Sequence, residues 1–454
     1  MITALLRNRD YLRLFTAQVS ALFGTGLTTV ALGLLAYELA GADATAVLGT
    51  ALTIKMLVYV TVAPIVAAYA DRFPRRGFLV ALNAIRALVV LALPFIDQVW
   101  QIYALIAVLQ TASAAFTPTY QAIIPDILPD ERDYTRALSA AQLAATMETL
   151  LSPMLAAAAL LLMSYHWLFV GTAVGFMLSG ALVLATRIPN AGTVSAGSFR
   201  ERVVLGMRIF AATPRLRGLL GLNLVVAAAG SVIMVNTVNY VRDTLGGTQT
   251  GVAILLAANG FGTMLSALLL PRVLDRVEPR PVMLTGAAVL LTGLVSIVAL
   301  STAGAGDWRW GAALAAWAVV GAGTAAVLTP TGQVLRRSAQ PADRPALFAA
   351  QFSLSHVAWL VAYPIAGWVT AGAGFTAALV VLTVLAVLGI AVAVGMWPRH
   401  DPAEITHLHA EGTIDPARLV DAIRVGEGIY QHTHAFIIDA EHRRWPRTAT
   451  ATVG

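Results

Sequence analysis

Long apolar stretches, separated by short polar breaks, recur along the whole chain. A helix of about 20 apolar residues crosses the ~30 Å hydrocarbon core of a bilayer. The pattern therefore predicts an all-α membrane protein with twelve spans. In chain order they cover residues 11–37, 45–70, 77–96, 99–124, 135–163, 167–187, 216–241, 250–271, 281–302, 309–330, 346–370 and 373–396.

The longer polar stretches predict four parts of the chain: 1–187, 188–215, 216–397 and 398–454. In the second part, arginines alternate with apolar residues from Phe199 to Ala211, which favours an amphipathic helix on the membrane surface. A plain linker is the alternative. In the polar fourth part, Asp415-Pro416 predicts a short helix that ends near Val425, because Asp is a good N-cap and Pro suits the first helical position. Residues 435–438 have the composition of a strand.

Several short motifs occur twice in the same order. Asp71-Arg72 recurs as Asp275-Arg276, and Thr117-Pro118-Thr119 recurs as Thr329-Pro330-Thr331. Repeats at matching positions predict two parallel six-span halves, which in transporters enclose the substrate site between them.

Composition agrees with a membrane protein: 58% of the residues are hydrophobic and only 12% are charged, against about 25% charged in soluble domains. Arginines concentrate in the N-terminal segment and in the breaks after even-numbered spans, while the opposite side holds only Arg242 and Arg309. Positive loops stay inside, so both termini are expected in the cytoplasm. The net charge of +6 thus follows from topology and does not indicate nucleic-acid binding. Without cysteine, disulfide and thiolate chemistry are excluded.

The basic loop after the second span carries a family resemblance. Asp71, Arg72, Arg75 and Arg76 resemble the G-x-x-x-D-R-x-G-R-R signature of the major facilitator superfamily, with Ala67 and Pro74 in place of the two glycines. In that family the loop is a conformational latch, so the resemblance implies that these four residues hold the outward-facing state. Asp275 and Arg276 are expected to form a weaker copy.

A second resemblance concerns the direction of transport. Ser152-Pro153-Met154-Leu155-Ala156-Ala157 is similar to the G-P-x-x-G-G element of exporters in this superfamily. The opening Asn8-Arg9-Asp10-Tyr11 and the segment from Pro118 to Glu131 resemble the bacterial branch that contains macrolide and siderophore exporters. The fourth span lacks the arginine that many drug/proton antiporters of the family have there, which weakens the case for proton antiport.

Three ionisable residues lie near the middle of predicted spans, where charge is costly and usually functional. Glu148 is the candidate proton carrier, with a structural ion pair to Lys55 as the alternative. Lys55, the only lysine, is either the counter-ion of Glu148 or an anion contact for cargo. His356 titrates in a useful range, but Ser353 or Ser355 offers it a purely structural partner.

Other polar residues in the spans are weaker candidates. Arg86 is expected to extend back toward Asp126 or lipid phosphates. Asn236, Asn239 and Asn259 are predicted to line the substrate cavity, and hydrogen bonding between helices is the alternative. Gln110 belongs to the same class.

The tail contains two His-x-His pairs, His407 with His409 and His432 with His434. Imidazoles bind Ni²⁺, Zn²⁺ and Cu²⁺, and some relatives in this branch export nickel and have histidine-rich tails. The pairs lie about 25 residues apart, so a tail that packs on the cytoplasmic loops is the competing interpretation.

The sequence thus predicts a plasma-membrane carrier of the major facilitator fold that exports a drug-like or siderophore-like molecule by proton antiport. A divalent-metal exporter and a non-transporting receptor or scaffold are the alternatives. The expected partners are cargo, protons and lipid, with no nucleic acid and no cofactor, and the expected state is a monomer. No enzymatic activity is expected, since neither a nucleotide-binding glycine loop nor a Ser/His/Asp set is present. The sequence does not specify the cargo.

Overall fold

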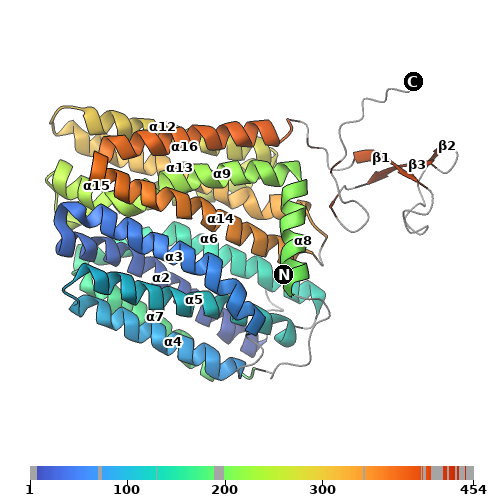
Figure 1. Ribbon diagram of the computed structural model, residues 1–454, viewed down its shortest axis with the longest axis horizontal. Helices are drawn as coiled ribbons and strands as arrows, with labels where there is room; N and C mark the ends of the chain where they lie inside the picture. Colours follow the sequence, from blue (N-terminus) through green and yellow to red (C-terminus); the bar gives the residue numbers. More distant parts are fainter. Residues whose placement is uncertain are drawn as a thin grey trace.

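The computed structural model describes residues 8–69, 74–128, 130–188, 199–340, 343–399 and 401, and within the tail 405–410, 423–426, 429–434, 437–438 and 445. Twelve long helices dominate this part of the chain, and each coincides with one predicted span (Figure 1). They are α2 (Arg9–Ala40), α3 (Ala44–Tyr69), α4 (Arg75–Ala92), α5 (Val99–Ile127), α6 (Glu131–Leu162), α7 (His166–Leu184), α9 (Pro214–Ser231), α11 (Gln249–Leu274), α12 (Pro279–Thr302), α13 (Trp308–Arg337), α14 (Arg344–Pro364) and α16 (Phe375–Met396).

Ten continuous stretches of the described chain are long and apolar enough to cross a membrane, and the first of them, Arg9–Val62, contains α2 and most of α3. The one long helix outside these ten stretches is α6. It is 32 residues long and begins with the charged residues Glu131, Arg132 and Asp133. The protein is therefore a multi-pass membrane protein whose spans are helices.

Local sequence signals set the limits of the helices. The Asn8 side chain caps α2 by accepting hydrogen bonds from the backbone N–H groups of Asp10 and Tyr11, as N-cap asparagines do. Gly41 ends this helix with φ +54°, and Gly374 separates two helices with φ +90°, a backbone region that favours glycine.

Two helices continue through wider π turns. After α9 the chain passes through η4 (Val232–Asn236), α10 (Thr237–Asn239) and η5 (Tyr240–Thr244), and after α14 it passes through η6 (Ile365–Val369) and α15 (Thr370–Ala373). Such π turns often mark functional positions. Short 3₁₀ turns, η1 (Gly41–Asp43) and η3 (Leu93–Phe95), follow α2 and α4.

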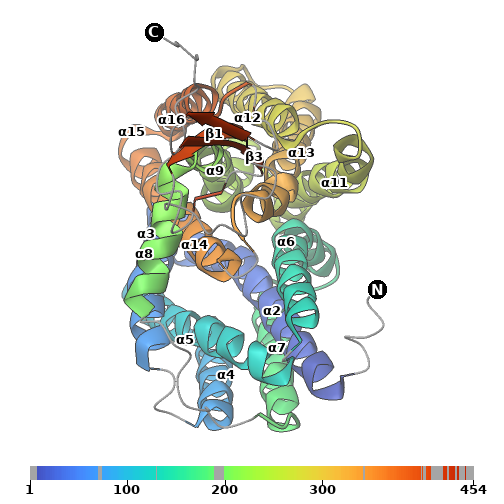
Figure 2. The same cartoon turned by 90° about the vertical axis from the view of Figure 1, so that its right-hand side faces the viewer.

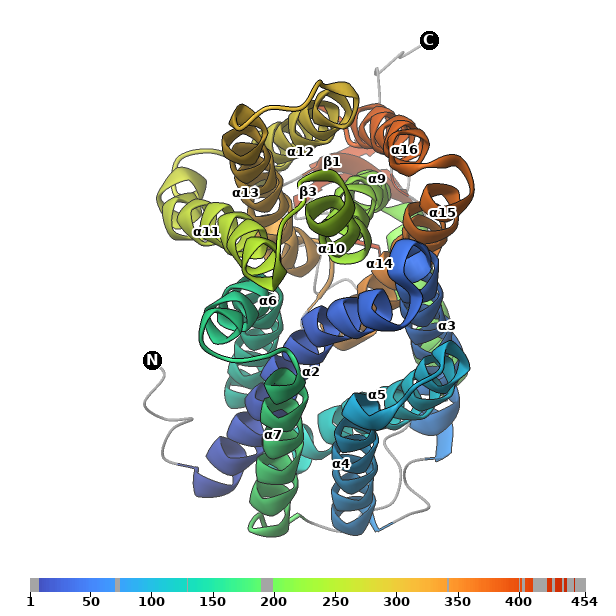
Figure 3. The ribbon, with the colours of Figure 1, turned by 90° about the vertical axis from the view of Figure 1, so that its left-hand side faces the viewer.

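The helices form two bundles that repeat one packing scheme. In the N-terminal half (α2 to α7), α2 packs on α7 and α3 on α5; in the C-terminal half (α9 to α16), the equivalent pairs are α9 with α16 and α11 with α13. The two bundles meet through α6 against α11 and through α3 against α14, as Figures 2 and 3 show from opposite ends of the molecule.

Helix α8 (Phe199–Ala212) crosses one end of the molecule, nearly perpendicular to the long helices (Figures 1 and 2). It occupies the stretch for which the sequence predicts an amphipathic helix. Its Gly206 lies so close to the Ala346 carbonyl of α14 that a Cβ there would overlap it. The described tail lies at the same end, which is called the linker end below.

The tail forms a three-stranded antiparallel sheet of β1 (Ile405–Ala410), β2 (Ile423–Gly426) and β3 (Ile429–His434), in the order β1-β3-β2. Two predictions about the tail are therefore wrong. The expected helix up to Val425 overlaps β2, and Ile437 and Ile438 lie outside any strand. In β2 and β3, β-branched residues and a tyrosine favour strands, whereas the helix prediction relied on one capping signal. Residues 411–422 and 435–436 lie outside the described part.

Candidate functional site

The three ionisable residues singled out in the spans converge on one tyrosine at the contact between the two halves. Tyr59 lies one helical turn after Lys55 on α3, and its ring stacks on the His356 imidazole of α14 with centroids 5.4 Å apart and planes 15° apart. Lys55 is close enough to both His356 and Glu148 to interact electrostatically, and Tyr59 interacts with Glu148 in the same way. Helices α3, α6 and α14 thus bring the cluster together.

The position of Glu148 depends on a small residue in the facing helix. A Cβ on Gly26 of α2 would lie 2.8 Å from Glu148 Oε1 and would overlap Ser152 Oγ. Glycine at this position therefore lets α6 approach α2 closely, with the Glu148 carboxylate lying against α2. Glu148 and Ser152 are one turn apart on α6, so they share a face.

His356 is held in one orientation by its own helix. Its Nδ1 donates to the Phe352 carbonyl oxygen at 2.6 Å, and its ring lies 4.0 Å from the Phe352 ring. Because a carbonyl only accepts, Nδ1 carries the proton and Nε2 is the nitrogen left to exchange one. Ser355 donates to the same carbonyl, so the backbone of its own helix is the partner that the structure describes for Nδ1.

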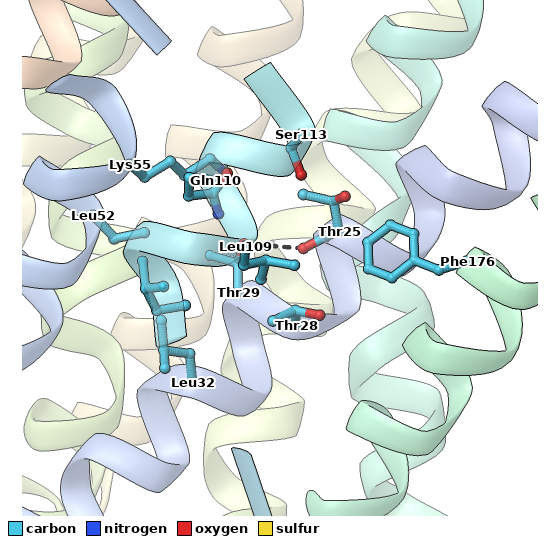
Figure 4. Close-up of a pocket in the computed structure, with 11 residues that line it drawn as sticks. Thr25, Thr28, Thr29, Leu32, Leu52, Lys55, Leu109, Gln110, Ser113 and Phe176 are labelled. Carbon is cyan, nitrogen blue, oxygen red and sulfur yellow. Dashed lines mark hydrogen bonds between the residues drawn. The ribbon is translucent and has the colours of Figure 1, made fainter. Parts of the chain in front are cut away.

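A small cavity lies beside the cluster, inside the N-terminal half. It has a volume of about 10 Å³, enough for about one water molecule. The lining residues are Thr25, Thr28, Thr29 and Leu32 of α2, Leu52 and Lys55 of α3, Ile106, Leu109, Gln110 and Ser113 of α5, and Phe176 of α7. Figure 4 shows Lys55 and Gln110 on one side and the threonines facing them.

The polar groups of this cavity differ in how well they are satisfied. The hydroxyls of Thr25 and Thr29 donate to carbonyls of their own helix at 3.0 and 3.2 Å. Gln110, by contrast, is 4% exposed, and its Oε1 has no hydrogen-bond partner among the described residues. A buried acceptor of this kind is costly unless water or a ligand completes it. The cavity therefore offers a ligand one ammonium group and one amide oxygen.

Arg86 is placed differently from the prediction. Its guanidinium carbon lies 4.2 Å from the centre of the Phe116 ring and 4.5 Å from that of Phe176, and Nη2 donates to Asn83 Oδ1. With 3% of its surface exposed, it does not snorkel toward lipid phosphates. Two aromatic faces stabilise the cation inside the bundle, and it interacts electrostatically with Tyr59.

The asparagines of the C-terminal half make hydrogen bonds between segments. Asn236 Nδ2 donates to Ala366 O and Thr370 Oγ1 at 3.1 and 2.9 Å. Asn259 Nδ2 donates to Trp317 O at 3.0 Å. Asn239 reaches Asp243 and, more weakly, the carbonyls that follow α2. Their predicted contribution to a substrate cavity stays a prediction.

The predicted latch is described only in part. Asp71 and Arg72 lie outside the described residues. Arg75 is buried at the first position of α4, and Arg76 donates to the Leu184 carbonyl at the end of α7. In the second loop, Asp275 and Arg276 are exposed. The latch function remains a prediction.

The four tail histidines lie on two neighbouring strands. The backbone register pairs His407 with His432 and places His434 opposite Ile405 and His409 opposite Tyr430. Their side chains are not among those described, and no group of three or more metal-ligating residues occurs among the described ones. Metal binding by the tail stays a prediction.

The hydrogen bonds that join described residues of the two halves lie at the end opposite α8. Tyr37 OH donates to Asp243 Oδ1 at 2.6 Å, and Trp368 Nε1 donates to Thr50 Oγ1 at 2.9 Å. The backbones of Gly49 and Gly367 meet at this end, where a Cβ on Gly49 would lie 2.8 Å from the Gly367 Cα. The two bundles are therefore closed against each other at this end.

Comparisons with known proteins agree on the fold. The sequence matches the family model of the Major Facilitator Superfamily over residues 14–233 and again over 219–427. No curated protein matches the chain at a significant level.

Solved structures of membrane transporters resemble it at low sequence identity. One is a bacterial homologue of the human lysosomal transporter Spinster in an inward-facing, unoccupied conformation, with 16% identity, a TM-score of 0.63, and coverage of 85% of this chain and 96% of that chain. The nucleoside transporter NupG has 16% identity and a TM-score of 0.61, with 85% and 97% covered. A D-xylose–proton symporter has 15% identity and a TM-score of 0.63, with 85% and 97% covered. At these identities the likeness shows the fold alone, whereas the two family matches span most of the sequence: the chain belongs to the Major Facilitator Superfamily.

Proposed function

We propose that this secondary-active transporter exports a small organic molecule in exchange for protons and that Glu148 carries the proton. The observation that carries the proposal is the cluster of Lys55, Tyr59, Glu148 and His356, which draws on both halves at their contact. A carboxyl and an imidazole can each take up and release a proton, and a lysine beside the carboxylate couples its charge to that of cargo. Alternating access requires a site of this kind between the halves.

The closure at one end supports alternating access. Hydrogen bonds join the halves at the end opposite α8, and an alternating-access carrier that is closed at one end opens at the other. We place the linker end in the cytoplasm of a plasma-membrane protein, with both termini inside, on the basis of the arginine distribution. Asp71, Arg72, Arg75, Arg76, Asp275 and Arg276 would then latch the cytoplasmic end when the carrier turns outward.

Export is favoured over import by the similarity of Ser152 to Ala157 to the exporter element of the superfamily. In the structure this segment of α6 provides Ser152, which packs against Gly26 one turn from Glu148. Movement of α6 against α2 would therefore change the surroundings of the carboxylate directly. That link between helix packing and protonation is what an antiporter requires.

The test is transport by the purified full-length protein in vesicles with an imposed pH gradient. A panel of macrolide-like, siderophore-like and cationic compounds is added, and proton flux is followed with a pH-sensitive dye trapped inside. Glu148→Gln should lower cargo-driven proton flux by about 100-fold, the scale of losing a proton-transfer group. Asp97→Asn, at an exposed carboxylate outside the helices, is the matched control. Unchanged proton flux in Glu148→Gln would refute the assignment of the proton carrier.

A second candidate, export of a divalent metal ion, is favoured by the strand register of the tail. The two His-x-His pairs, distant in sequence, lie on strands that pair directly, with His407 opposite His432, and neighbouring strands are only about 4.8 Å apart. Calorimetric titration of the full-length protein with Ni²⁺ tests it. A His407→Ala, His432→Ala double variant should lose binding that His166→Ala, in the N-terminal half, retains. No heat of binding in the unaltered protein would end this candidate.

A further inference from the structure

A second, larger cavity lies at the linker end of the C-terminal half, away from the cluster around Tyr59. Its volume is about 180 Å³, whereas a single water needs only about 10–15 Å³. The first turns of α9 and α12, the last turns of α13 and the chain after α16 form its walls. They contribute Arg215, Glu278, Pro279, Arg280, Gln333, Val334, Arg337, Trp397 and Asp401.

The walls of this cavity carry more positive than negative charge. Three arginines, from three different helices, face two carboxylates, Glu278 and Asp401. Arg215 is only 3% exposed, and its Nε and Nη1 have no hydrogen-bond partner among the described residues. Asp401 Oδ2 lies 3.7 Å from Nε, which is too far for a hydrogen bond. The arginine is thus buried with donors that nothing described satisfies, a state that costs free energy.

The other two arginines are oriented by backbone carbonyls. Arg280 donates from Nε and Nη2 to Trp397 O at 3.1 and 3.0 Å, and Arg337 donates from Nη2 to Asp401 O. A carbonyl oxygen fixes a guanidinium in place but does not neutralise its charge. The Asp401 carboxylate accepts a bond from Trp397 Nε1 at 3.2 Å, and its Oδ2 lies 3.7 Å from Arg337 Nη1. One carboxylate therefore serves two arginines, neither of them at hydrogen-bond distance.

We propose that this cavity binds one phosphate group. Guanidinium groups match phosphate oxygens in geometry and charge, and the unsatisfied donors of Arg215 supply the first contacts. The phosphate belongs either to an anionic lipid headgroup of the leaflet at the linker end or to a soluble phosphate ester. The site lies within the C-terminal half and is separate from the proposed proton site.

The Asp401 carboxylate competes with a bound phosphate for Arg215. Asp401 lies five residues after the end of α16, at the beginning of the tail, and its Oδ2 is 3.7 Å from Arg215 Nε. The tail also covers this arginine from another side, because the Trp445 ring lies 5.0 Å from the Arg215 guanidinium carbon. Phosphate bound beside Asp401 would meet a like charge, which lowers affinity, so removing that charge should strengthen binding.

The experiment measures the unfolding temperature of the full-length protein in detergent, with inorganic phosphate or with chloride at matched ionic strength. Phosphate should raise the unfolding temperature, since a ligand that binds only the folded state stabilises it. Asp401→Asn should unfold at a lower temperature in chloride, because it removes the carboxylate that lies 3.7 Å from both Arg215 and Arg337. It should recover in phosphate and bind phosphate about tenfold more tightly than the unaltered protein, as expected for the loss of one like charge.

Arg215→Gln should abolish the phosphate effect, and Arg337→Gln provides the same test should the first variant fail to fold. Arg272→Gln, at an exposed arginine near the end of α11, is the matched control and should keep the effect. Equal unfolding temperatures in phosphate and chloride, in both the unaltered protein and Asp401→Asn, would overturn the proposal. Survival of the phosphate effect in Arg215→Gln and Arg337→Gln would overturn it as well, because the ion would then act elsewhere.

Nanodiscs distinguish the two sources of phosphate. If the ligand is a headgroup, discs containing phosphatidylglycerol should stabilise the unaltered protein relative to phosphatidylcholine discs, and Arg215→Gln should remove the difference. If it is a soluble ester, glucose 6-phosphate should stabilise the protein in phosphatidylcholine discs, with the same dependence on Arg215.

Discussion

The helix pairs α3–α5 and α11–α13 occupy equivalent places in the two halves, yet they differ in how closely their backbones approach each other. Between α3 and α5, Lys55 and Gln110 face a space of about 10 Å³. Between α11 and α13 the backbones themselves are in contact: a Cβ on Gly321 would overlap Asn259 O, and one on Gly262 would overlap Ala318 O. The same pair of helices thus leaves room for polar groups in the N-terminal half and is closed by backbone contact in the C-terminal half.

The repeat shows how few residues make this difference. The 204-residue offset that relates Asp71 to Asp275 also relates Lys55 to Asn259. At the lysine position the C-terminal half has a neutral amide, whose Nδ2 donates to Trp317 O at 3.0 Å. A flexible cation needs space and a partner, whereas an amide is satisfied by the neighbouring helix backbone. We infer that, of these two equivalent positions, only Lys55 takes part in the proposed coupling.

The largest effect on stability is expected from a substitution that separates the closely packed helices α11 and α13. Gly321→Ala should destabilise the protein by about 3 kcal/mol, since the added methyl meets a backbone carbonyl that cannot move alone. The unfolding temperature of the purified protein measures it. Gly332→Ala on the same helix is the control: no atom lies within 4 Å of its Cβ position, so it should be neutral or stabilising by up to about 1 kcal/mol. Equal stability of the two variants would show that α11 and α13 are not in close contact.

The next largest effect is expected when Lys55 of the α3–α5 pair is replaced by asparagine, the residue at the equivalent position 259 of the α11–α13 pair. Lys55→Asn should leave the unfolding temperature almost unchanged, because Lys55 is only half-buried beside a cavity. Cargo transport should nevertheless fall by about 30-fold, corresponding to loss of a charge-assisted contact worth about 2 kcal/mol. Lys55→Arg keeps the charge, so its transport rate should lie between those of the unaltered protein and Lys55→Asn. Full transport by Lys55→Asn would assign this lysine a merely structural role.

The fold could be predicted from the sequence because it depends on a one-dimensional signal. Apolar stretches of spanning length, short breaks and repeated motifs determine twelve helices in two halves, and every predicted span contains a helix. The sequence predicts the secondary structure of the tail poorly, because that structure depends on tertiary contacts. Short amphipathic segments such as Ile423–Gly426 adopt a strand or a helix according to their tertiary partners, and those partners were not visible in the sequence.

Only the ionisable residues of the candidate site could be predicted from the sequence. Lys55, Glu148 and His356 stand out because charge is rare inside spans, but their shared neighbour Tyr59 and the cavity residue Ser113 carry no such signal. Helical spacing offered a hint, since Tyr59 lies four residues after Lys55 and Ser113 three after Gln110. The position of Arg86 could not be inferred, because its two aromatic partners come from other helices.

A smaller effect should follow from removing the amide that closes the second pair. Asn259→Ala loses one hydrogen bond between helices and should cost about 1 kcal/mol of stability. If the amide only joins α11 to α13, the KM for cargo should stay unchanged while the unfolding temperature falls. Asn223→Ala, whose amide bonds to Gln351 within the C-terminal half at 3.4 Å, is the control. A clear rise in KM for Asn259→Ala alone would place this residue in the substrate cavity and weaken the contrast between the halves.

The smallest effect should come from weakening the contact between the two halves at the end opposite α8. Tyr37→Phe removes the 2.6 Å bond to Asp243, which joins the halves at an exposed position, where one hydrogen bond contributes about 0.5 kcal/mol. Opening at this end should therefore become about twofold more frequent. Because the chain contains no cysteine, a single Val238→Cys substitution, at a buried position that lies against Gly33, reports opening through its rate of thiol labelling. Tyr103→Phe, which alters a tyrosine of α5 rather than a contact between the halves, should leave that rate unchanged. If both tyrosine variants label at the original rate, the closure depends on the backbone contact of Gly49 with Gly367 and not on this hydrogen bond.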